Sequence, residues 1–223
     1  NQHPHTLVMT ATPIPRSVAM TVFGDLEVSE LKELPAGRQP IQTVFVNTRT
    51  QPSWVDRAWQ RIREEVGAGR QAFVVCPAIT GKQTEGELEA GEALTAVEDL
   101  LPQLASGPLN GLRLAMVHGK QPAAERDATI SGFAAGEVDV LVATTVIEVG
   151  VDMPNATVMV VMDADRFGIS QLHLLRGWVG RGADPGLCLL LAAPQPGTPA
   201  IERLEAVAET SDGFLLAERD LEL

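Results

Sequence analysis

The sequence has little cysteine and no long apolar run, and each shortage excludes a class of protein. Its two cysteines, Cys76 and Cys188, both lie within apolar runs. That position is typical of buried thiols in a reducing compartment, and it argues against a disulfide framework or a redox or metal site. No apolar run approaches the roughly 20 residues that span a bilayer, and the first residues do not resemble a signal peptide. We therefore expect a cytoplasmic protein without a membrane contact.

Basic residues are also scarce, since 17 lysines and arginines stand against 29 acidic residues and the net charge is −12. A protein that grips DNA non-specifically usually carries a basic face, because its affinity comes from neutralising phosphates. Any contact with DNA must therefore be local, or must come largely from other parts of the protein. The acidic cluster at 85–99 is typical of a solvated loop that leads into a helix, so no metal site is expected there.

Six short apolar runs predict the strands of a sheet. They are continuous and do not alternate with polar residues, which is typical of strands buried on both faces. The runs are 43–47, 71–78, 112–118, 138–145, 156–165 and 186–193. Stretches with helical spacing separate most of them, and strand–helix alternation gives right-handed crossovers. The expected fold class is therefore α/β, with a doubly wound, mostly parallel sheet covered by helices on both faces.

Apolar residues at helical spacing predict the helices that cover this sheet. The first such set shares one helix face and comprises Trp54, Val55, Ala58, Trp59, Ile62 and Val66. We expect this face to pack on the sheet.

The two ends of the chain do not belong to the strand–helix repeat. The beginning resembles the last strand and helix of a preceding domain, followed by a linker in which a glycine stands between two prolines. Near the other end, PQPGTP is a second break, followed by a helix over about 200–209 and a further helical segment. Both ends therefore look cut. The expected division is 1–34, 35–40, 41–195 and 196–223.

Polar residues gather in the loops that follow the predicted strands. In an open parallel sheet, ligands bind beyond the carboxyl ends of the strands. Two of these loops hold His118 with Gly119 and Thr144 with Thr145. Glycine-containing loops let backbone N–H groups approach a phosphate closely, and threonine hydroxyls add further donors. These loops are therefore candidate contacts to a nucleic-acid backbone.

Two arginines, Arg176 and Arg181, fall five residues apart at a predicted helix end and its turn. An arginine there can neutralise charge that develops on a transferring phosphoryl group. Every candidate also has an ordinary structural alternative: the threonine pair as caps, His118 as a hydrogen-bonded strand end, and Asp152 as an Asx-type turn residue. The joint order and spacing of the candidates favour the functional interpretation.

Four motifs carry a resemblance to the RecG family of superfamily 2 helicases. TATPIPR (10–16) resembles helicase motif III, VHGKQPAAERD (117–127) the segment after the third strand, LVATTVIEVGVDMPNATVMVV (141–161) motif V, and QLHLLRGWVGRG (171–182) motif VI. The stretches 19–41 and 212–223 are similar to RecG in particular, the latter to the opening of its helical coupling hairpin. The resemblance covers essentially the whole chain. The related motor of transcription-repair coupling factors is the nearest alternative.

The resemblance implies a RecA-like domain, ATP and Mg²⁺ as cofactors, and branched DNA, namely stalled forks and Holliday junctions, as the substrate in repair and recombination. Implied protein partners are the first motor domain, the wedge domain and single-stranded DNA-binding protein. The resemblance implies that Thr10, Ala11 and Thr12 couple the nucleotide site to the DNA site, and that His118, Gly119, Thr144 and Thr145 contact DNA. It implies nucleotide contacts by Gly150, Asp152 and Arg181. It also implies catalytic roles for Arg181, as an arginine finger, and for Arg176.

Two positions depart from the family pattern of motif VI. The pattern Gln-x-x-Gly-Arg-x-Gly-Arg falls on 174–181, where this sequence has Leu174 and Trp178. An indole supplies neither the charge nor the planar set of donors of a guanidinium. If both side chains face an open cleft, the departures lower ATP turnover and leave the fold unaffected. A non-catalytic helicase-like module that binds DNA or protein is therefore a second hypothesis.

The sequence contains neither a Walker A motif nor a DExH box. TGKQT (80–84) lacks the first glycine and the Lys–Ser/Thr pair that a phosphate loop requires. The Mg²⁺ ligands are therefore expected in another domain, and this chain alone is expected to be inactive. The same shortage argues against a stand-alone nucleotide-binding protein.

Overall fold

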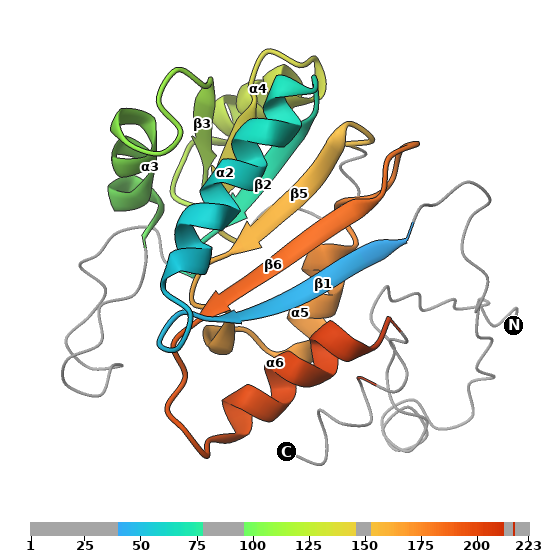
Figure 1. Cartoon of the computed structure of the whole chain (residues 1–223). Helices are drawn as coiled ribbons and strands as arrows, with labels where there is room; N and C mark the ends of the chain where they lie inside the picture. The colour runs from blue at the N-terminus through green and yellow to red at the C-terminus, as the bar shows by residue number, and fades with distance from the viewer. Residues whose placement is uncertain (1–39, 78–95, 146–152, 212–215, 217–223) are drawn as a thin grey trace, which may run out of the picture.

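The computed structural model describes residues 40–77, 96–145, 153–211 and 216, which form a sheet with helices on both faces (Figure 1). Six strands of this part run parallel in the order β1-β6-β5-β2-β4-β3. Their bounds are β1 Ile41–Asn47, β2 Gln71–Val75, β3 Leu114–Val117, β4 Val140–Ala143, β5 Ala156–Val161 and β6 Gly186–Ala192. All six predicted strands are present, and the predicted fold class is confirmed.

Two helices cover one face of the sheet and three cover the other (Figure 1). The first group is α2 (Ser53–Gly67) and α3 (Val97–Ser106). The second group is α4 (Ala123–Ala134), α5 (Ile169–Arg176) and α6 (Pro199–Glu209), with the short 3-10 helix η1 (Ala164–Arg166) leading into α5. In the described part of the chain, no helix is long and apolar enough to cross a membrane.

The sheet separates two apolar cores, because successive side chains of a strand point to opposite faces. In β2, Ala72 and Val74 pack in the core under α2 and α3, while Phe73 and Val75 pack in the core under α4, α5 and α6. All five residues of β2 are buried. Burial on both faces is the reason that this run is continuously apolar.

The two cysteines lie one in each core, and both are buried. Burial disfavours the thiolate and is the main cause that raises the pKa of Cys76 to about 12 and that of Cys188 to about 12. The prediction of buried thiols is confirmed.

Helix α6 continues the domain beyond the predicted break at 194–199. Thr198 precedes it in extended conformation and Pro199 takes its first position, where a missing N–H costs nothing. Leu204 and Val207 of α6 are buried in the core that α5 also covers, and α6 packs on β1. The predicted helix over 200–209 is present, and it packs on the same core as α5.

Two details differ from the prediction. The fifth strand was expected to reach residue 165 but ends at Val161, because Asp163 adopts the left-handed conformation (φ +46°) and η1 follows. Trp54 was assigned to the buried face of α2 but is 46% exposed. It lies in the first turn of α2, ahead of Ala58, the first residue of that helix to be buried.

Several predicted features lie outside the described residues. These are the strand, helix and linker before residue 40, the acidic loop, most of the segment after 211, and the candidate residues Thr10, Ala11, Thr12, Gly150 and Asp152.

Candidate functional site

The candidate residues divide between two opposite edges of the sheet. We call the edge where the parallel strands end the carboxyl edge, and the edge where they begin the amino edge. His118 and Thr144 lie at the carboxyl edge, directly after β3 and β4. The turn around Arg181 lies at the amino edge, because α5 leads from the end of β5 back to the beginning of β6 (Figure 1). The rule that ligands bind beyond carboxyl ends therefore located only half of the candidates.

At the carboxyl edge, His118 and Thr144 lie side by side and are almost fully buried. They are 6% and 5% exposed, and they follow the paired residues Val117 and Ala143. The Thr144 amide donates to the Val117 carbonyl at 3.2 Å. Thr145, the next residue, is exposed. The two loops thus present one buried and one exposed threonine next to a histidine.

Two polar atoms at this edge are buried without a hydrogen-bond partner among the described residues: His118 Nδ1 and Thr144 Oγ1. The other ring nitrogen, His118 Nε2, lies 3.9 Å from a carboxylate oxygen of Glu98. Leaving a buried polar atom unpaired costs about 1–3 kcal/mol, so such atoms call for an explanation. An oxygen-rich ligand would satisfy the hydroxyl.

The turn after His118 has its own support. The His118 amide donates to Gln121 Oε1 at 3.0 Å, and Gln121 Nε2 donates to the Met116 carbonyl at 3.3 Å. Gly119 lies in this turn and is exposed. The backbone at Gly119 is therefore held in a defined position and is open to a ligand.

At the amino edge, two glycines hold the Arg181 turn against the residues that lead into β5. Gly180 has φ +69°, and its amide donates to the Ala156 carbonyl at 3.4 Å. A Cβ on Gly182 would lie 2.3 Å from the Pro154 carbonyl oxygen, so only glycine fits there. The Gly-Arg-Gly pattern of the sequence is the signal of this close approach.

The Arg181 side chain is half-buried, and its Nε donates to the Gly177 carbonyl at 2.8 Å. This bond orients the guanidinium at the amino edge and leaves part of it in contact with solvent. Pro154 lies beside this turn, and the candidate nucleotide residues Gly150 and Asp152 precede it in sequence.

Arg176 has a different place from the one expected. It is 5% exposed, and its Nη1 donates to the carbonyls of Val207 and Thr210, each at 2.7 Å. Nη2 also lies 2.6 Å from His173 Nδ1. Burial lowers the pKa of Arg176. Its charge caps the end of α6, so the catalytic role that we expected is corrected to a structural one.

Trp178 is part of the core, so the condition that its side chain faces an open cleft is not met. It is 6% exposed, and its ring lies edge-on to Phe73, with centroids 5.7 Å apart. Phe73 in turn packs against Phe133 of α4 at 5.0 Å. Apolar rings prefer such tilted packing over solvent. Leu174, the other departure from motif VI, is half-buried on α5.

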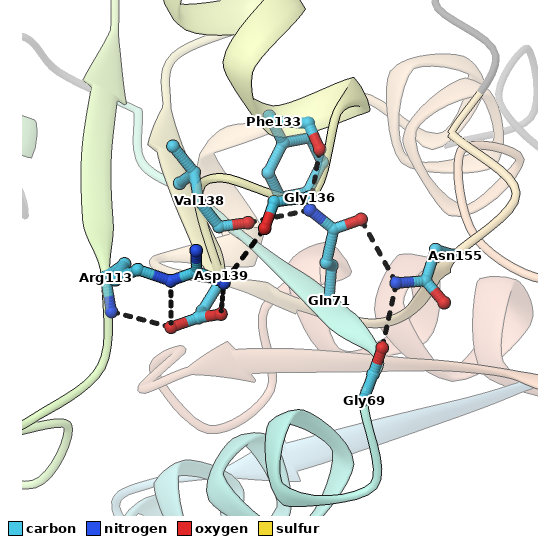
Figure 2. Close-up of polar contacts among 8 residues, drawn as sticks. All are labelled: Gly69, Gln71, Arg113, Phe133, Gly136, Val138, Asp139 and Asn155. Atoms are coloured by element: carbon cyan, nitrogen blue, oxygen red, sulfur yellow. Dashed lines mark hydrogen bonds and ion pairs between the residues drawn. The ribbon is translucent and has the colours of Figure 1, made fainter.

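A buried glutamine anchors the amino edge, and no sequence pattern pointed to it (Figure 2). Gln71 is 5% exposed, and its Nε2 donates to the carbonyls of Phe133 and Val138, each at 2.7 Å. Asn155 Nδ2 donates to Gln71 Oε1 at 3.3 Å and to the Gly69 carbonyl at 3.0 Å. The network joins β2, β5 and the end of α4.

An ion pair closes the same edge at β3 and β4 (Figure 2). Arg113 Nη2 lies 2.8 Å from Asp139 Oδ1 and donates to the Gly136 carbonyl at 2.9 Å, and Arg113 Nε donates to Asp139 Oδ2 at 3.2 Å. The hydrogen bonds from Arg113 hold the pKa of Asp139 below its usual range. The polar groups of Arg113 and Asp139 therefore satisfy one another.

Comparisons with known proteins agree with the fold described above. Residues 56–183 match the helicase conserved C-terminal domain family. The chain is 59% identical over 221 residues to the ATP-dependent DNA helicase RecG of Mycobacterium leprae, covering 98% of this chain and 30% of that protein. It is 45% identical over 222 residues to the RecG of Bacillus subtilis, covering 100% and 31%. The chain thus spans about 30% of the length of these relatives.

Solved structures give the same result. RecG bound to a three-way DNA junction matches 99% of this chain and 29% of its own length, with a TM-score of 0.76 and 37% identity. Domain 2 of the DEAD-box helicase Mss116p matches with a TM-score of 0.54 at 17% identity, a likeness of fold alone. The chain therefore belongs to the helicase conserved C-terminal domain family, in the form that this domain takes in RecG.

Proposed function

We propose that the chain is the second motor domain of an ATP-dependent DNA helicase that remodels stalled forks and Holliday junctions in repair and recombination in the cytoplasm. The observation that carries this proposal is the division of the site between two edges of one sheet. A motor has to hold ATP and DNA at the same time and pass movement from one to the other. A sheet packed on both faces, with a different polar site at each edge, suits that task.

The carboxyl edge is the proposed DNA contact. Thr144 Oγ1, which is buried and has no partner among the described residues, donates to a backbone phosphate oxygen. The exposed Thr145 hydroxyl and the Gly119 backbone add neighbouring donors, and His118 Nδ1, which is buried without a partner among the described residues, lies beside them. These groups reach only a few phosphates, in keeping with a net charge of −12.

The amino edge is the proposed nucleotide contact. Arg181 supplies its guanidinium to the phosphates of ATP as an arginine finger, which stabilises charge in the transition state. Gly150 and Asp152 are the other proposed nucleotide contacts. ATP and Mg²⁺ are held by a P-loop domain, because the 223 residues contain no Walker A motif and no DExH box.

The other proposed roles belong to the ends of the chain. Thr10, Ala11 and Thr12 couple the nucleotide site to the DNA site, and residues 212–223 begin the hairpin that couples hydrolysis to translocation. Branched DNA, the first motor domain, the wedge domain and single-stranded DNA-binding protein are the proposed partners. RecG bound to a three-way DNA junction is the solved structure that supports the DNA partner.

Steady-state ATPase assays with fork DNA test the proposal. The 223-residue chain alone should show no turnover, because it supplies one wall of the nucleotide site, and the full-length protein should show DNA-stimulated turnover. Fork DNA should bind the chain weakly, and its affinity should fall with log salt at a slope that reflects a few phosphates. Turnover by the chain alone at the rate of the full-length protein would contradict the proposal.

One observation favours a second function, that of a non-catalytic module. The indole of Trp178 occupies the position of a motif VI arginine and is buried against Phe73. That position therefore contributes no charge to a nucleotide. A full-length protein that binds fork DNA but hydrolyses no ATP would establish the module.

A further inference from the structure

We infer that Arg70, which directly precedes β2, and Gln71, the first residue of β2, position the turn that carries Arg181. This inference rests on the proposed nucleotide role of that turn. Consecutive residues of a strand point to opposite faces of the sheet. In this chain the Arg70 side chain bonds Asp184, at the end of the Arg181 turn. The Gln71 side chain bonds Asn155, in the segment against which this turn packs.

Arg70 holds the far end of the turn. Its Nη2 donates to Asp184 Oδ1 at 3.2 Å, and Asp184 lies three residues after Arg181, shortly before β6 begins. Arg70 Nε lies 3.5 Å from Glu65 Oε2, and the Arg70 amide donates to the Glu65 carbonyl at 2.9 Å. Arg70 is therefore fixed to α2 on one side and reaches the turn on the other.

Glu65, which holds Arg70, is itself held by two further contacts. Its side chain is 13% exposed, and it also lies 2.9 Å from Arg61 Nη2 and accepts from Thr157 Oγ1 at 2.8 Å. Thr157 follows Ala156, the residue whose carbonyl accepts from Gly180. One carboxylate thus joins α2, β5 and Arg70.

Gln71 holds the support beneath the turn. Its amide donates to the Asn155 carbonyl at 3.0 Å, and the two side-chain amides bond at 3.3 Å (Figure 2). Asn155 lies between Pro154 and Ala156, the residues against which Gly182 and Gly180 pack. Because Gln71 is itself bound to the end of α4, the support cannot shift without breaking buried hydrogen bonds.

Arg70 acts on the Arg181 turn through Asp184, and Gln71 acts on it through Asn155. Both are therefore positioning residues. A displacement of about 1 Å at a reacting group can cost on the order of 10²-fold in rate. The ion pair of Arg113 and Asp139 is the matched control, since it closes the same edge on β3 and β4, on the opposite side of β2 from β5 and β6.

Hydrogen exchange in the 223-residue chain tests the positioning without any reference to activity. Arg70→Met and Asn155→Ala should each accelerate exchange of the Gly180 amide at least about fivefold relative to amides in the middle of β2. Arg113→Met should leave this ratio unchanged, whatever it does to the urea midpoint. An unchanged ratio in both test variants would overturn the inference.

ATPase kinetics of the full-length protein with fork DNA test the consequence. Arg70→Met should lower kcat about tenfold and change the KM for ATP less than twofold, since a displaced arginine finger is felt mainly in the transition state. Arg70→Lys, which keeps the charge, should restore most of kcat. An equal loss of kcat in Arg113→Met would show a merely structural effect and would also overturn the inference.

The positioning role of Arg70 and the nucleotide role of the Arg181 turn can be disproved separately. If Gly180 exchange accelerates while Arg70→Met and Arg181→Ala both leave turnover unchanged, the positioning stands and the proposed nucleotide role of the turn is wrong. If Arg181→Ala abolishes turnover while the Arg70 variants change neither exchange nor kcat, the positioning is wrong and the proposed function stands.

Discussion

The carboxyl and amino edges of the sheet differ in how they satisfy their polar atoms. At the carboxyl edge, His118 Nδ1 and Thr144 Oγ1 are buried without a partner among the described residues. At the amino edge, Gln71 uses its amide nitrogen twice and its amide oxygen once, and Asp139 accepts from both the backbone and the side chain of Arg113.

This difference indicates two kinds of site in one domain. A polar network in which each member is bonded is rigid, whereas a buried polar atom without a partner favours binding of a ligand that completes it. The amino edge therefore suits a group that must stay in place, such as Arg181. The carboxyl edge suits a contact that forms and breaks as a motor moves along DNA.

Removing the Arg181 guanidinium is the strongest test of the amino edge. In the full-length protein, Arg181→Ala should lower DNA-stimulated kcat by on the order of 10³–10⁵, the value of an arginine finger in phosphoryl transfer. Arg181→Lys should recover little, because an ammonium lacks the planar set of donors. DNA affinity, measured by fluorescence anisotropy, should stay the same. A fall in DNA affinity that matches the fall in kcat would contradict the separation of the edges.

Substitutions of Trp178 and Trp54 test which of the two tryptophans belongs to the core. Trp178→Ala should lower the free energy of unfolding of the chain by about 3–5 kcal/mol, because it removes a buried aromatic side chain. Trp54→Ala should change it by less than about 0.5 kcal/mol, because that indole is 46% exposed. Urea unfolding followed by circular dichroism measures both. Equal losses would mean that Trp178 lies in an open cleft after all.

Removing the Thr144 hydroxyl tests the proposed phosphate contact at the carboxyl edge. Thr144→Val should leave the free energy of unfolding unchanged or slightly higher, because its hydroxyl is buried without a partner among the described residues. The affinity of the full-length protein for fork DNA should fall about tenfold, since a hydrogen bond to a charged phosphate is lost. Thr43→Val is the control. The Thr43 hydroxyl is also buried without a partner among the described residues, but it lies within β1 and not at the carboxyl edge. An equal fall in affinity in both variants would remove the phosphate contact from Thr144.

The smallest effect concerns pH at the amino edge. Hydrogen bonds from Arg113 lower the pKa of Asp139 in the folded chain. The carboxylate therefore contributes stability above about pH 4, the unfolded value, and this contribution is lost as pH falls through the lower folded value. Asp139→Asn should thus destabilise the chain at pH 7 and by less at pH 3, in urea unfolding at both values. A difference that grows on acidification would contradict the ion pair.

Much of the fold was predictable because the signals are local. The run 71–78 is apolar without alternation, and β2 is buried at every position. The break at 194–199, followed by helical spacing, predicted a helix where α6 lies. The residues of the site stay predictions, and their arrangement could not be read from the sequence. Arg176 carries the same charge as Arg181 in sequence, yet one caps α6 and the other lies half-buried in a glycine turn.

The sequence by itself determined the six strands, the helices between them and the family motifs, because each depends on residues that are neighbours along the chain. Only the tertiary structure decided that Arg181 and Thr144 lie at opposite edges, that Trp178 is buried and Trp54 exposed, and that Gln71 reaches Asn155. Those outcomes depend on which strands become neighbours. Strand β2 has β4 on one side and β5 on the other, although their first residues come 69 and 85 positions after Gln71. No local pattern records such a contact, since it follows from the crossover path and from how the two cores pack.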